Sequence, residues 1–160
     1  MKTPKNEEHY VNNKEFTAAV VEYIELVNKA KKKKLDHPTI PHYIGECFLR
    51  IAEGLSHKPS FYSYSYREEM VMDGVENCIK AIHNYDINAS TRSGRPNPFG
   101  YFTQIIWFAF LRRIAKEKKQ QEIKDRYIAQ SNIASFMTDD GNDVNNSSMI
   151  ERMRSRYEEY

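Results

Sequence analysis

The sequence contains little cysteine, glycine or proline, and it has no long apolar run. Cys47 and Cys78 are too few for a disulfide framework and fit a reducing cytoplasm. Glycine and proline number 6 each, and apolar residues recur at spacings that suit helices. No stretch of 18 apolar residues exists, and the N-terminus is polar, so we expect neither a membrane span nor a signal peptide.

The sequence also lacks the motifs of common catalytic and nucleotide sites. It has no glycine-rich phosphate loop, no His-Glu-x-x-His and no Gly-x-Ser-x-Gly. His37, His42 and Cys47 follow at five-residue steps, which scatter side chains around a helix, so we expect no metal or cofactor. We therefore expect no enzyme. The net charge of +2 restricts any nucleic-acid surface to a local patch.

Helical periodicity predicts a compact all-α bundle. A helix that Asn12 or Asn13 caps extends to about residue 34, and a second follows the prolines at 38 and 41 and ends near 56. A third helix covers about 66–85, a fourth about 98–129, and a short segment 149–160. We expect a flexible N-terminus at 1–10, a helical domain at 11–131, and a linker with a flexible C-terminal tail at 132–160.

The third helix combines an acidic face with a glycine near its middle. Glu69, Asp73 and Glu76 recur at helical spacing and share a face, where solvated acids are commoner than catalytic pairs and a basic partner is a third option. Gly74 costs about 1 kcal/mol relative to alanine in a helix interior. Close packing of a neighbouring helix is the reason we expect for it.

The fourth predicted helix is apolar on two sides. One side is a complete core stripe of Phe99, Ile106, Phe110 and Ile114, with Phe102 and Trp107 at its margins. The opposite side carries Tyr101, Ile105 and Phe108, followed by Arg112 and Lys116. Either another helix covers this second side, or it is exposed and meets a partner. Aromatic rings followed by cations favour nucleic acid, because bases stack on rings and cations contact phosphates.

Several motifs in order resemble bacterial sigma factors. The segment EMVMDGVENCIKAIHNYD at 69–86, followed by FGYFTQ at 99–104, is similar to their core-binding and promoter-reading helices. YVNNKE at 10–15, IAEGLS at 51–56, and Asn97-Pro98 ahead of Tyr101 and Thr103-Gln104 resemble the late sigma factors of T4-type bacteriophages more closely. The resemblance covers roughly residues 10–125.

The resemblance implies a factor that binds host core RNA polymerase and directs it to A·T-rich late promoters through a −10-like element, in the cytoplasm of the infected bacterium. It implies that the third helix binds the clamp helices of the largest polymerase subunit. The contact residues are Glu69, Met72, Asp73, Glu76 and Lys80. The resemblance also implies that a second set of residues binds promoter DNA: Arg92, Arg95, Tyr101, Phe102, Gln104, Ile105, Phe108, Ala109, Arg112, Arg113, Lys116, Lys118 and Lys119.

The chain differs from primary sigma factors at one position of the fourth helix, and its C-terminal segment suggests a further partner. Primary sigma factors carry two adjacent tryptophans where this chain has Ile105-Ile106, so either Phe102 and Phe108 substitute for them or other factors open the strands. The segment 149–160 after the linker is the candidate tail for a phage sliding clamp, with a late co-activator as a further partner. The alternative function is a non-catalytic helical protein whose apolar and basic helix is an oligomer or protein interface.

Overall fold

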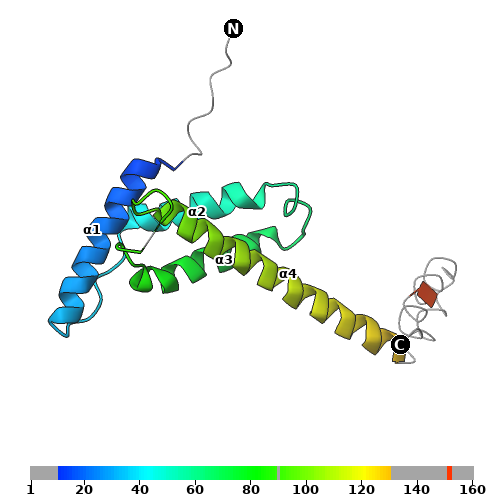
Figure 1. The fold of residues 1–160 in the computed structure, drawn as a ribbon. Coiled ribbons are helices and arrows are strands. Elements are labelled where there is room, and N and C mark those ends of the chain that lie inside the picture. Colours follow the sequence, from blue (N-terminus) through cyan, green and yellow to red (C-terminus); the bar gives the residue numbers. More distant parts are fainter. Residues whose placement is uncertain (1–10, 90, 131–150, 153–160) are drawn as a thin grey trace, which may run out of the picture. The chain divides into compact units, whose positions relative to one another are not determined.

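The computed structural model describes residues 11–89, 91–130 and 151–152, and the described part is helical without any strand. The helices are α1 (Asn13–Lys32), α2 (His42–Ser56), α3 (Arg67–Ala81) and α4 (Pro98–Gln130), with a 3₁₀ helix, η2 (Ile82–Asn84), directly after α3 (Figure 1). The predicted all-α fold is confirmed. Residues 151 and 152 are helical, while the rest of the expected tail and the N-terminal 1–10 lie outside the described residues.

The chain divides into two compact units, Met1–Arg113 and Ile114–Tyr160. The first contains α1, α2, α3, η2 and the first half of α4, and the second begins within α4. The helical domain at 11–131, with a boundary after residue 131, stays a prediction.

Local sequence explains most of the helix ends. The Asn12 side chain accepts hydrogen bonds from the backbone N–H groups of Lys14 (3.1 Å) and Glu15 (3.5 Å), as expected of an N-cap. Pro41 precedes the first residue of α2. The third helix ends at Ala81, earlier than expected, because the chain tightens into η2, where the N–H of Tyr85 donates to the carbonyl of Ile82.

An aromatic cluster joins α1, α2 and α4 in the first unit. The Phe102 ring lies 4.7 Å from Phe48 and 6.2 Å from Phe16, measured between ring centroids. Tyr85, which follows η2, packs 5.8 Å from the same ring. Phe102, Phe48 and Phe16 are completely buried, so this cluster forms the centre of the core.

Gly74 lets α4 approach α3 closely. A Cβ atom at this position would lie 3.0 Å from Cγ2 of Ile106 and 3.3 Å from Cε1 of Phe110. Both neighbours are fully buried side chains of α4, so they have little room to move. The packing role expected for Gly74 is therefore confirmed.

We predict that Gly74→Val lowers the free energy of unfolding by about 1–3 kcal/mol, because the added atoms overpack the α3–α4 contact. Gly54→Val is the matched control, since a Cβ at this other helical glycine meets no atom within 4 Å. Urea denaturation of both variants measures the difference. Equal stability of the two variants would contradict the packing role.

A histidine pair fastens the α1–α2 connection to η2. The rings of His37 and His83 stack at 4.7 Å, and the Tyr23 hydroxyl donates to the carbonyl of Pro38 at 2.8 Å and lies 3.5 Å from Nδ1 of His83. The Lys31 ammonium donates a hydrogen bond to the His83 carbonyl at 3.0 Å. Burial lowers the pKa of His83, and the charges of His37 and Lys31 lower it further.

This lowered pKa predicts a loss of stability in acid. The unfolded chain binds a proton at this side chain near pH 6.5, whereas the folded chain binds it only at lower pH. Stability therefore falls as the pH drops below about 6.5, by at most about 1.4 kcal/mol per pH unit for one proton. We expect His83→Gln to reduce this slope in urea titrations between pH 7 and 5.

His42→Gln is the control for the histidine prediction, because His42 is exposed at the start of α2. It should leave the slope close to that of the parent chain. A slope that His83→Gln leaves unchanged would show that other groups cause the acid sensitivity.

Candidate nucleic-acid and protein interfaces

The first half of α4 has one buried and one exposed side, as a helix between core and solvent requires. Phe102, Ile106 and Phe110 are completely buried, whereas Phe108 is 49% and Tyr101 36% exposed. Ile105 is half-buried between them. The predicted second apolar side is therefore accessible within the first unit, and none of its three members belongs to the core.

The exposed side of α4 borders a shallow groove of about 370 Å³. From α4 come Ile105, Phe108 and Arg112, and from α3 come Asn77, Lys80 and Ala81. An aromatic ring, an aliphatic side chain and two cations thus surround one concave surface. Such a surface offers a ring for stacking and charges for phosphate contact, which is the combination that binds single-stranded nucleic acid.

Arg112 and Arg113, which follow Phe108 on α4, form hydrogen bonds to side chains of α3. Arg113 forms a bidentate ion pair with Asp73, with Nε–Oδ2 and Nη2–Oδ1 distances of 2.6 and 2.8 Å. Arg112 donates from Nη2 to the Oδ1 atom of Asn77 at 3.0 Å. The resemblance assigned Arg113 to DNA and Asp73 to polymerase, and in the structure the two side chains pair with each other. In this conformation the Asp73–Arg113 ion pair is a clasp between α3 and α4, and the Arg112–Asn77 hydrogen bond is a second contact between the same two helices.

Phe102 and Ala109 require a correction. Phe102 is completely buried and Ala109 is almost so, and neither side chain can reach a partner in this conformation. The helical wheel placed Phe102 at the margin of the core stripe, but the rings of Phe16 and Phe48 cover it. Of the two phenylalanines expected to replace the tryptophan pair, only Phe108 is accessible.

The loop before α4 holds the other predicted cations of the first unit. Arg92 and Arg95 are exposed, as is Gln104 on the first turns of α4. Within the loop, the Thr91 hydroxyl donates to the Arg95 carbonyl, and Gly94 adopts a positive φ of 68°, a conformation that favours glycine. In the second unit, Lys116, Lys118 and Lys119 are exposed on α4.

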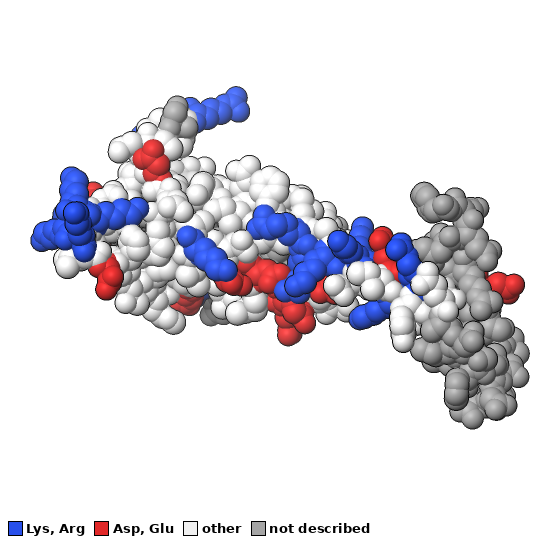
Figure 2. All heavy atoms as spheres, turned by 90° about the horizontal axis from the view of Figure 1, so that it is seen from below, with Lys and Arg blue, Asp and Glu red and all other residues white. Residues whose placement is uncertain are grey.

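The outer side of α3 combines acids with an exposed apolar side chain. Met72 is 61% exposed, and Glu69 beside it is exposed as well. Glu76 pairs with Lys80 in an ion pair that solvent reaches on both sides. Figure 2 looks onto this side and shows acidic and basic side chains next to one another. Four of the five predicted polymerase contacts are therefore accessible, and Asp73 is the exception.

Two exposed apolar residues of α3 and of the first half of α4 were not among the site residues predicted from the sequence. Ile79 on α3 and Leu111 on α4 are 41% and 43% exposed. Ile79 follows Met72 by seven residues, which is two helical turns, so the spacing alone could have shown that they share a side. Trp107, by contrast, packs against Phe61 at 4.8 Å and is partly covered.

Comparison with known proteins gives no assignment: no protein-family model matches the chain, and no curated protein matches its sequence. Within the ranges that the structure describes, no helix combines the length and apolar character that crossing a membrane requires.

The Asp73–Arg113 clasp predicts an energetic coupling between α3 and α4. Because the pair is bidentate and its side chains are only 28% and 19% exposed, we expect a coupling of about 1 kcal/mol in a double-mutant cycle with Asp73→Ala and Arg113→Ala. The solvated Glu76–Lys80 pair is the control, with about 0.3–0.5 kcal/mol expected. Urea denaturation supplies the free energies, and equal couplings would rule out a special role for the clasp.

Proposed function

We propose that this chain is a sigma-type promoter-specificity factor of the late phage class. It binds host core RNA polymerase, directs it to A·T-rich late promoters through a −10-like element, and performs no bond chemistry itself. It acts in the cytoplasm of the infected bacterium. The resemblance over residues 10–125 supports this proposal, and the observation that carries it is the exposure of Tyr101 and Phe108 beside Arg112 on one side of α4.

The chemistry of that side suits opened DNA better than closed duplex. A base that stacks on an exposed aromatic ring contributes about 1–3 kcal/mol without reading a particular sequence. Only the strand of an opened promoter presents unstacked bases. Arg112 is exposed in spite of its hydrogen bond to Asn77, so it can contact a phosphate next to a base on Phe108.

The outer side of α3 supports a separate contact with polymerase. Exposed Met72 and Ile79 surrounded by acids form a small apolar patch of a kind that docks on another protein. Because Met72 and Ile79 lie on α3 and Tyr101 and Phe108 lie on α4, one chain can hold polymerase and DNA together, with Lys80 at the border of the two surfaces. The net charge of +2 accords with this order, since a factor that polymerase delivers to DNA needs little affinity of its own.

The same exposed side of α4 also supports the rival function. Phe108, Leu111 and Tyr101 form an apolar surface that a second copy or another protein can cover. This interpretation predicts a change of oligomeric mass when the surface is altered, which the promoter-factor proposal does not.

Run-off transcription with core polymerase on an A·T-rich late-promoter template tests the proposal. We expect Phe108→Ala to lower the amount of transcript about tenfold, which corresponds to about 1.4 kcal/mol of lost stacking. Arg112→Ala should lower it as well. Binding to core polymerase, measured by co-elution, should stay unchanged because both side chains are exposed on α4.

Tyr62→Ala is the matched control, since Tyr62 is an exposed aromatic residue outside α4. It should leave transcription intact. If Phe108→Ala leaves the transcript unchanged and instead alters the mass in sedimentation, the rival function holds. Absence of promoter-dependent transcript with the parent chain would overturn the proposal directly.

A further inference from the structure

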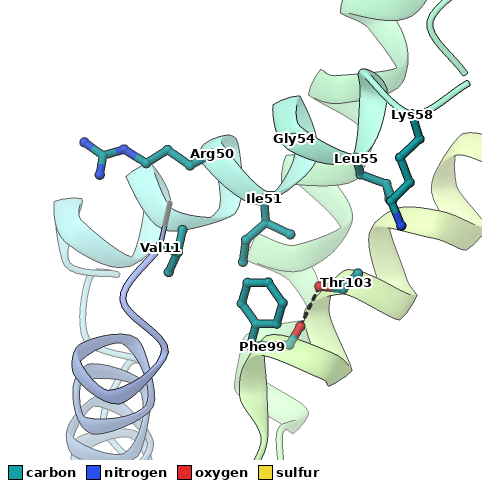
Figure 3. A pocket seen from close by; sticks show the side chains of 8 residues that line it. All are labelled: Val11, Arg50, Ile51, Gly54, Leu55, Lys58, Phe99 and Thr103. Carbon is teal, nitrogen blue, oxygen red and sulfur yellow. Dashed lines mark hydrogen bonds between the residues drawn. The ribbon is translucent and has the colours of Figure 1, made fainter. Parts of the chain in front are cut away.

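A second groove, of about 310 Å³, lies between α2 and the start of α4 in the first unit (Figure 3). Its apolar lining consists of Val11, Ile51, Leu55 and Phe99. In Figure 3 the Phe99 ring points across the groove toward Ile51, so that an aromatic and an aliphatic surface face each other. Ligand pockets begin at about 300 Å³, so a groove of this size suits one large side chain rather than a bulky ligand.

Gly54 keeps one wall of this groove open. At Gly74 the close approach of α4 explains the glycine, whereas a Cβ at Gly54 would meet no atom within 4 Å. Packing within the described part of the chain therefore does not require a glycine here, although glycine weakens a helix interior relative to alanine. The missing side chain instead leaves free space where an occupant of the groove would lie against α2.

The charge at the border of the groove is positive. Arg50 and Lys58 are its charged lining residues, and of the acids that the structure describes none lines it. Arg50 is already paired, with its Nη2 atom 2.6 Å from Oε1 of Glu46. The Lys58 ammonium extends toward α4 in Figure 3 and forms no ion pair with any residue that the structure describes. The charge that an occupant meets is therefore chiefly that of Lys58, which a carboxylate complements.

The floor of the groove favours a hydrocarbon side chain over a nucleic-acid base. The Thr103 hydroxyl donates to the Phe99 carbonyl at 2.7 Å, so its proton is already engaged. The apolar lining offers no other donor, and a base buried there would leave polar atoms of its edge without partners. A leucine or phenylalanine side chain carries no such atoms and is stabilised by leaving water.

We propose that this groove is the docking site for a short acidic segment of a partner protein. One large apolar side chain of the segment lies between Ile51 and Phe99, and a carboxylate beside it pairs with Lys58. The apolar contact supplies most of the affinity, and the ion pair selects acidic over basic segments. The groove shares no lining residue with the one that Phe108 and Arg112 border, so this inference is independent of the proposed promoter function.

A titration of the full-length chain with the unlabelled peptide Glu-Glu-Leu-Phe-Glu-Glu tests the inference. The NMR methyl signals of Leu55 and Thr103 report on the groove, and that of Ile79 on α3 is the reference because Ile79 does not line it. We expect the two groove signals to shift to saturation with a Kd below about 1 mM, which corresponds to about 4.1 kcal/mol, while the Ile79 signal stays unchanged.

Two further peptides separate the two contacts. Lys-Lys-Leu-Phe-Lys-Lys retains the apolar side chains but reverses the charge, and Glu-Glu-Ser-Ser-Glu-Glu retains the charge but lacks the apolar side chains. Neither should shift the groove signals at the concentrations that saturate the first peptide. Equal affinity for the acidic and the basic peptide would overturn the inference, as would the absence of saturation with the first one.

Variants of the groove test the same contacts from the protein side. Gly54→Leu should abolish the saturable shift, because its side chain starts in free space and fills the groove. Lys58→Glu should weaken binding about five- to tenfold through charge reversal. Lys29→Glu is the matched control, since Lys29 is exposed in the last turn of α1 and does not line the groove, and it should leave the Kd unchanged.

The Ile79 signal shows whether each variant keeps its fold, so a loss of binding is separated from unfolding. Binding that survives in Gly54→Leu would contradict the assigned position of the apolar side chain. An oligothymidylate that shifts the Leu55 and Thr103 signals at lower concentration than the acidic peptide would assign the groove to nucleic acid instead. Shifts that appear on raising the protein concentration alone would assign it to a second copy of this chain, and both results would overturn the inference.

Discussion

The close contact of α3 with α4 at Gly74 is the constraint on which the first unit depends. Only a residue without a side chain leaves room for Ile106 and Phe110 at this point. Once those two side chains face α3, the helical repeat fixes which residues of α4 point away from it. The exposure of Phe108, and the position of Arg113 beside Asp73, follow from that single contact.

Electrostatics within the first unit favours internal pairing over a broad basic surface. Arg113 is held by Asp73 and Arg112 by Asn77, so the cations of α4 in this unit also stabilise its own contact with α3. A phosphate that approaches Arg112 competes with one hydrogen bond to a neutral amide, whereas one that approaches Arg113 competes with a bidentate ion pair. Of the two arginines, Arg112 therefore yields to a partner more readily.

Sequence patterns predicted the parts of the fold that depend on neighbours along the chain. Asn12 as a cap, the prolines before α2 and the core stripe of α4 each rest on local geometry. The patterns were less accurate where packing decides. The resemblance assigned Phe102 to DNA, and the helical wheel put it only at the margin of the core stripe, because a wheel cannot show that Phe16 and Phe48 lie across from that position.

Local sequence patterns are sufficient to show that the chain is helical, where most helices begin and end, and that α4 has two apolar sides. Only the packed helices show which of these sides solvent reaches, that Asp73 and Arg113 pair with each other, and that a groove opens beside Val11. This difference arises because helical periodicity reflects contacts between residues three or four positions apart. Burial and ion pairing between helices instead join residues distant in sequence, such as Asp73 and Arg113, and no local pattern encodes such a meeting.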